Sequence, residues 1–302
     1  MRVTDRTVHQ NATTHMTNSL ADYYDVMEKN ASGKQFRWAS DNVPNALASL
    51  SIRSTLDKGD AYIETAKTTD LWMYATNAAL DDMEDLATRA INLTLQGMSD
   101  TMGDQQRAAI ATELDTILQQ VISTANREHQ NNYIFSGFQT NTKPFVLEAN
   151  LTPPPDDIVT YYGDTGNMTR NIGPKDPVQI NLNGTIFNDV GHDIFTDLIT
   201  IRDAMATFDR AILDTGLASL RTTMQYLTNQ HTEYAGRHRE LQDSMERMDK
   251  TKVDLQALLS QKEDINMAEA VTMLAKQETV YQTVLSVSSR AISMMGLFDR
   301  MT

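Results

Sequence analysis

Two histidines, His231 and His238, have the residue type and the helical spacing that raise the question of a metal site. They are seven residues apart, which is about 10.5 Å along a helix. That is too far for both imidazoles to bind one ion at about 2.1 Å. Polar side chains on an otherwise apolar helix stripe more often set the register of packed helices. We therefore predict a structural role for both histidines and no metal site.

Other residues with chemical potential also favour structural interpretations. The acidic clusters Asp81–Asp85 and Asp156–Asp157 lack the alternating spacing of a calcium loop, so we interpret them as a solvated helix face and a loop. Gly163–Gly166 has no following lysine or helix and favours a hairpin turn over a phosphate-binding loop. No hydrolase, dinucleotide or zinc-protease motif occurs, and the chain has no cysteine. We predict no enzyme, no catalytic residue and no cofactor.

Charge and hydropathy exclude further classes of partner. The net charge of −14 disfavours nucleic acid and anionic membrane surfaces, since both are bound mainly through Lys and Arg. No apolar run approaches the length of a membrane span. The first twenty residues lack the apolar core of a secretory signal. We expect a protein that is neither membrane-anchored nor exported by the general secretory route.

One long heptad pattern contains His231 and His238 and dominates the C-terminal half of the chain. Nine of its twelve positions are apolar, and steps of four and three return each side chain to one helix stripe. At 1.5 Å per residue this stripe is about 60 Å long, which requires other long helices beside it. The positions are Leu220, Met224, Leu227, His231, Tyr234, His238, Leu241, Met245, Met248, Lys252, Leu255 and Leu259.

Proline positions divide the chain into helical and non-helical parts. All seven prolines lie at Pro44 or between Pro144 and Pro177. Because an interior proline costs a helix about 3 kcal/mol, long helices belong in the flanking stretches. We predict helices from Trp72 to Leu93 and from Ile110 to Val121, with a break at Gly97–Gly103. One long helix is predicted from about Asp193 onward.

The middle of the chain has the pattern of short strands. Alternating runs at 158–162 and 168–172 are separated by the turn formers 164–167, and runs at 178–182 and 185–187 by Asn183-Gly184. Both arrangements are typical of hairpins. We predict a small β-domain inserted between two helical halves.

The two ends form a third predicted part. A stripe beginning at Met267 is out of phase with the long heptad, and the polar stretch 261–264 between them suggests a hinge. A weaker stripe from Val8 ends near Gly33. We predict an elongated, mainly α protein with an inserted β-domain. Its parts are a terminal coil of 1–42 plus 264–302, a helical rod of 43–135 plus 193–263, and an outer β-rich domain of 136–192.

Short motifs occur at both ends and in the centre of the chain. They are Met1–Thr4, Ala31–Lys34, Ser40–Asp41, Asn126, Asn132–Thr140, Lys143–Phe145, Val159–Asp164, Asn183–Phe187, Met267–Val271 and Gln277–Gln282. In this order they resemble the flagellin-like axial proteins of the bacterial flagellum, and within that family the proteins of the hook–filament junction. The order is more specific than any one motif. Asn42-Val43-Pro44 departs from the family's usual Asp-Pro, and the ending Gly296–Thr302 is a looser match.

The resemblance implies a structural adaptor at the junction between flagellar hook and filament. It implies a homo-oligomeric ring of about eleven copies, seated on hook-associated protein 1 and carrying flagellin. It further implies type III export to the cell exterior, with a cytosolic chaperone near the C-terminal coil. A flagellin and a cytosolic coiled-coil scaffold remain the alternatives.

In this interpretation the tails become ordered among neighbouring copies, because two lone helices bury little surface. The alternative is that the same residues form an ordinary pair of helices within one chain. The candidate subunit-interface residues are Leu20, Tyr23, Met27, Val271, Leu274, Tyr281, Leu285, Ile292 and Met295.

Overall fold

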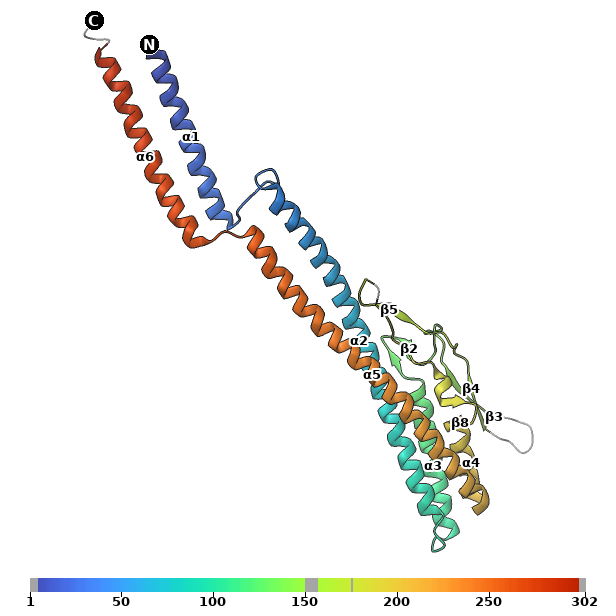
Figure 1. The fold of residues 1–302 in the computed structure, drawn as a ribbon. Coiled ribbons are helices and arrows are strands. Elements are labelled where there is room, and N and C mark those ends of the chain that lie inside the picture. Colours follow the sequence, from blue (N-terminus) through green and yellow to red (C-terminus); the bar gives the residue numbers. More distant parts are fainter. Residues whose placement is uncertain (1–4, 150–156, 175, 299–302) are drawn as a thin grey trace. The chain divides into compact units, whose positions relative to one another are not determined.

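The structure is a computed structural model that describes residues 5–149, 157–174 and 176–298. The described chain is mostly helical, with short strands between α3 and α4, so the predicted fold class is confirmed (Figure 1). Met1–Thr4, Asp156 and residues 299–302 lie outside the described residues. The helices are α1 Asp5–Ser32, α2 Val43–Gly97, α3 Asp104–Ala125, α4 Ile194–Thr207, α5 Arg210–Glu263 and α6 Met267–Phe298.

The short elements pair only with near neighbours. β1 pairs with β2, β3 with β4, β5 with β6 and β7 with β8, each pair being antiparallel. The strands are β1 Glu128–His129, β2 Asn132–Tyr133, β3 Phe145–Ala149, β4 Asp157–Tyr161, β5 Thr169–Asn171, β6 Pro177–Gln179, β7 Asn188–Asp189 and β8 His192–Asp193, and a 3-10 helix η1 spans Gly184–Phe187.

Contacts divide the chain into two compact units. Unit 1 contains residues 1–58 and 250–302, and unit 2 contains residues 59–249. The finer division into three parts stays a prediction. None of the described helices combines the length and the apolar composition that crossing a membrane requires.

Unit 2 is built on the predicted heptad stripe of α5. Leu220, Leu227, Tyr234 and Leu241, each seven residues after the last, are at most 2 % exposed. They belong to one apolar core with side chains of α2, α3 and α4. The heptad therefore faces the core of unit 2, as the spacing predicts.

The two histidines of the stripe bind to α2. His238 Nε2 lies 2.8 Å from Asp70 Oδ1, and its Nδ1 lies 2.8 Å from Asn77 Nδ2. His231 Nδ1 lies 3.0 Å from Glu84 Oε1. These bonds are specific to one register of α5 against α2, which agrees with the predicted structural role. Among the described residues no group of three or more His, Asp and Glu side chains could hold a metal ion.

The single helix predicted from Asp193 onward is wrong, because the chain turns between α4 and α5. Phe208 has a left-handed backbone with φ of 54°, and the guanidinium of Arg107 lies 3.4 Å from its ring centroid. Asp209 then begins α5, since its Oδ1 accepts hydrogen bonds from the N–H groups of Ala211 and Ile212. Contact with α3 and a new N-cap outweigh the local preference for one continuous helix.

The predicted hairpins are also wrong in their partners. β4 pairs with β3, which precedes the proline-rich loop, and not with β5. Asp164 Oδ1 accepts hydrogen bonds from the N–H groups of Phe138 and Gly166, each at 2.8 Å, so this loop is bound to an earlier segment. The Gly184 N–H donates to the carbonyl of Phe135 at 2.7 Å, and the following residues form η1 instead of a strand.

Asn126, at the end of α3, connects the helical part of unit 2 to the strands. Its Nδ2 donates to the Phe145 carbonyl at 2.8 Å, and its Oδ1 accepts from the Phe145 N–H at 2.9 Å. Phe145 and Phe135 are fully buried. Much of the motif from Asn126 to Phe145 is therefore structural.

We expect Asn126→Ala to lower the free energy of unfolding of unit 2 by about 2 to 4 kcal/mol, because both backbone groups of buried Phe145 lose their partner. Urea denaturation followed by circular dichroism measures this. Asn132→Ala is the control, since Asn132 makes one local bond to the Gln130 carbonyl. Equal losses for the two variants would contradict the role of Asn126.

Asp197 is a buried carboxylate that joins α4 to α5. Its Oδ2 accepts a hydrogen bond from Thr223 Oγ1 at 2.7 Å. Burial raises the pKa of Asp197 above its ordinary value, although the hydroxyls of Ser219 and Thr223 oppose the shift. A raised pKa in the folded state means that the folded protein binds this proton more tightly than the unfolded chain does.

The contribution of Asp197 to stability should therefore grow as pH falls from neutrality toward about 4. We expect Asp197→Asn to raise stability relative to the parent chain most at neutral pH and least near pH 4. Paired urea titrations at pH 7 and pH 4.5 measure this difference. The same stability difference between Asp197→Asn and the parent chain at both pH values would refute the raised pKa of Asp197.

Candidate interaction surface of the terminal helices

The two terminal helices α1 and α6 lie side by side in unit 1 (Figure 1). The Tyr23 and Tyr281 rings stack with centroids 6.1 Å apart and an interplanar angle of 14°. Asn30 Nδ2 donates to the Ala270 carbonyl at 2.8 Å. Because later residues of α1 contact earlier residues of α6, the pair is antiparallel.

The seam between these helices is narrow. On α6 it follows steps of four and three, as expected for one face of a packed helix. Among the side chains described on the two helices, Ala12, Ser19 and Ala270 are buried, and all three are small. The half-buried side chains on the two helices are Met16, Leu20, Tyr23, Val26, Lys29, Asn30, Leu274, Gln277, Tyr281, Val284 and Ser288. A seam of this kind removes little apolar surface from water.

The nine predicted interface residues divide into three groups. Four are half-buried in the seam within the chain: Leu20, Tyr23, Leu274 and Tyr281. Three remain exposed, namely Met27 at 41 %, Val271 at 56 % and Leu285 at 37 %. Ile292 and Met295 lie on α6, and their side chains are outside the described residues. The intersubunit role of all nine stays a prediction.

Further exposed apolar side chains lie on both sides of the α6 seam. At 100° per residue, Met267 and Val271 fall on the same side as Leu285, which we call the Leu285 flank. Met273, Val280 and Val287 are seven residues apart and fall on the opposite side, which we call the Met273 flank. The spacing of this second stripe is that of a helix that packs against another helix.

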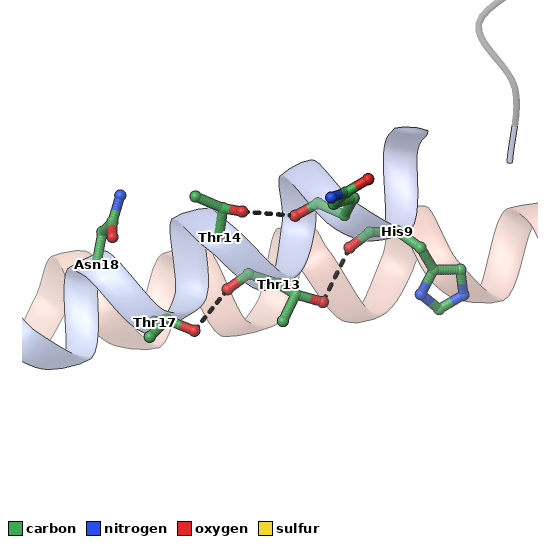
Figure 2. Close-up of a pocket in the computed structure, with 6 residues that line it drawn as sticks. His9, Thr13, Thr14, Thr17 and Asn18 are labelled. Carbon is green, nitrogen blue, oxygen red and sulfur yellow. Dashed lines mark hydrogen bonds between the residues drawn. The ribbon is translucent and has the colours of Figure 1, made fainter. Parts of the chain in front are cut away.

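The α1 surface in Figure 2 offers little for chemistry. An open hollow of about 550 Å³ is lined by α1 residues that include His9, Thr13 and Thr17. The hydroxyls of Thr13 and Thr17 donate to the carbonyls of His9 and Thr13, four residues earlier. These donors are satisfied within their own helix. We assign no ligand to this hollow.

The segment that follows α1 and the segment that precedes α6 meet in a joint that the sequence did not predict. Lys34 and Asp264 form an antiparallel β-bridge. The Gln35 N–H donates to the Glu263 carbonyl at 2.7 Å, and the Ile265 N–H donates to the Gly33 carbonyl at 2.9 Å. Gly33 has φ of 70°, a left-handed conformation that glycine adopts readily.

The side chains of this joint form an ion network. Glu263, which is 6 % exposed, accepts from Arg53 Nε at 2.9 Å and from Lys34 Nζ at 3.2 Å. The Arg53 guanidinium lowers the pKa of Glu263, and the Lys34 ammonium lowers that of Asp264. The Ala31–Lys34 motif and the polar stretch 261–264 were the available sequence signals, but neither indicated that they meet.

Asn42-Val43-Pro44, which departs from the family's usual sequence, still begins helix α2 with a normal N-cap. Asn42 Oδ1 accepts from the Asn45 N–H at 3.2 Å, as an N-cap residue does. Pro44 occupies the first turn of α2, where a missing N–H costs nothing. Asp41 Oδ2 accepts from the Trp38 N–H at 3.0 Å, so the Ser40–Asp41 motif shapes the preceding loop.

Comparisons with known proteins agree with this architecture. Residues 3–140 match the family described as the bacterial flagellin N-terminal helical region. Flagellar hook-associated protein 3 of Salmonella typhimurium is 23 % identical over 235 residues, which cover 74 % of this chain and 68 % of that protein. Crystal structures of Bacillus cereus FlgL and of the flagellar junction protein FlgL from Legionella pneumophila share the fold. The Bacillus cereus structure has a TM-score of 0.60 at 21 % identity and covers 70 % of this chain and 99 % of its own. The Legionella pneumophila structure has a TM-score of 0.59 at 12 % identity and covers 72 % of this chain and 99 % of its own.

The fold and the N-terminal match show a likeness to flagellin-type helical proteins. Among such proteins the chain resembles flagellar hook-associated protein 3, and the resemblance predicted from the motifs is confirmed. These relatives support a flagellar hook–filament junction protein. They are flagellar components, which agrees with a non-enzymatic role.

The narrow seam predicts low local stability of the terminal pair. In a dilute solution of the isolated chain, we expect amides of α1 and α6 to exchange with solvent at least about a hundredfold faster than amides of α3. Hydrogen exchange with mass spectrometry measures this, and α3 serves as the control within the same molecule. Equal protection of α1, α3 and α6 would contradict the interpretation.

Proposed function

We propose that this chain is a structural adaptor of the flagellar hook–filament junction, which joins the first junction protein to the flagellin filament. The observation that carries the proposal is the exposed apolar surface on both flanks of the α6 seam. The resemblance to hook-associated protein 3 supports a role of this surface in the flagellum, because relatives with that name are flagellar components.

The terminal helices are the proposed subunit interface. Val271 on the Leu285 flank and Val287 on the Met273 flank are more than half exposed, although both are large and apolar. Side chains on two sides of one helix can contact two different neighbours. Such contacts between unlike surfaces close into a ring when the rotation between copies permits it. The tails would gain most of their order in that assembly.

Charge supports contact between copies along α6. The chain has a net charge of −14, so like copies repel each other over most of their surface. From Thr279 to Phe298 the sequence has no acidic residue, and Arg290 is its only charged residue. Copies can therefore approach along this stretch without repulsion between carboxylates.

The remaining partners follow from the same proposal. The adaptor sits on hook-associated protein 1 and carries flagellin, in a ring of about eleven copies. It reaches the cell exterior through the flagellar type III apparatus, with a cytosolic chaperone bound near the C-terminal helix. The division into a terminal coil, a helical rod and an outer β-rich domain belongs to this proposal as well.

Complementation separates this role from its alternatives. In a strain that lacks its own hook-associated protein 3, the chain should restore attachment of filaments to hooks. A flagellin would not restore attachment. A cytosolic coiled-coil scaffold would stay in the cytoplasm of a normally flagellated cell.

Leu285→Asp tests the interface in that strain. We expect the variant to be exported, to retain the helical content of unit 2 and to lose filament attachment, because a charge would enter an apolar seam between copies. Ser286→Asp is the matched control, since Ser286 is exposed and lies on the outward face of α6. The readouts are filament counts by electron microscopy and protein in the medium. Normal filaments with Leu285→Asp would refute the interface.

A further inference from the structure

The connector joint, consisting of Gly33–Gln35 and Glu263–Ile265, has the structure of an ionic latch. Two backbone hydrogen bonds join the segment that follows α1 to the segment that precedes α6. A ladder this short is weak by itself, because each backbone hydrogen bond contributes little net stability in water. Its stability must depend on the side chains around it.

One carboxylate organises those side chains. Glu263 belongs to α5, yet it accepts from Arg53 of α2 through both Nε and Nη2, at 2.9 and 2.5 Å. It also accepts from Lys34, which binds Asp264 Oδ1 at 2.6 Å. A two-pronged Arg–carboxylate pair with a nearly buried acid is among the stronger charged contacts in proteins.

Each charged group favours its ionised state in this arrangement. The pKa of Lys34 is raised by Asp264, and that of Arg53 is raised by Glu263. Among the residues that the structure describes, Glu263 alone contacts both cations and, through its carbonyl, the backbone ladder. Removing its charge leaves Arg53 and Lys34 facing each other without a shared acceptor.

We infer that Glu263 is the central residue of an electrostatic latch that makes α1 and α6 order and release together, so that ionic strength sets the stability of both tails at once. The latch joins the connector that follows the end of α1 to the connector that precedes the start of α6. When it opens, both helices lose the same anchor, although they are more than 200 residues apart in sequence. This inference does not depend on the proposed function, since it concerns the isolated chain.

Hydrogen exchange by NMR on the full chain tests the latch. We expect Glu263→Gln to raise exchange about tenfold or more at Gln35 and Ile265, and to raise it in both α1 and α6. Asp254→Asn removes the same charge from an exposed site on α5 and should leave these rates unchanged. Sodium chloride at about 1 M should move the parent chain toward the Glu263→Gln rates.

A second variant separates charge from packing. In Glu263→Ala, added acetate should restore protection better than chloride at the same ionic strength, because a carboxylate can occupy the space beside Arg53 and Lys34. Faster exchange in only one terminal helix would overturn the inference. So would equal effects of Glu263→Gln and Asp254→Asn, or rescue by acetate that is no better than chloride.

Discussion

The heptad seam of α5 against α2 is the constraint on which the structure of unit 2 depends. Leu220, Leu227 and Tyr234 face the core at seven-residue intervals and bury large side chains completely. Apolar contacts along a helix do not by themselves exclude a slip of one turn. The polar pairs His238–Asp70 and His231–Glu84 supply the missing specificity, because a shift would leave charged or polar groups without partners. α3 and α4 then pack onto a seam whose register is already determined.

The strands depend on the helical core of unit 2 for their position. Asn126 and Tyr161 bind backbone groups of earlier or later segments, with Asn126 Nδ2 donating to the Phe145 carbonyl and Tyr161 OH to the Phe135 carbonyl. Each strand pair has too few residues to be stable alone. Attachment to α3 and burial of Phe145 therefore matter more to this region than the strand ladders do. Buried residues such as Phe135 and Phe145 therefore account for much of the central motif.

Unit 1 differs from unit 2 in the contacts that hold its parts together. Among the side chains described on its terminal helices, only the small ones of Ala12, Ser19 and Ala270 are buried, and aliphatic residues are exposed on either flank of α6. The Glu263 network concentrates charge where the two connectors meet. The proposed ordering of the ends against neighbouring copies requires terminal helices that are weakly stable alone but joined to each other, and this distribution of contacts is compatible with both requirements.

The sequence by itself determined where long helices occur and where two of them end. Proline confined the irregular region, Gly33 and Gly97 ended helices where predicted, and the heptad identified the buried face of α5. These features are local, since periodicity and backbone preference act within a few residues of the chain. Tertiary structure decided what depends on distant partners. It placed the turn at Phe208 under Arg107, paired β4 with β3, and brought Glu263 to Arg53. It also divided the predicted interface residues between a seam within the chain and an exposed surface. Spacing along one helix shows that side chains share a face, but only the position of the neighbouring helix decides which of them is covered.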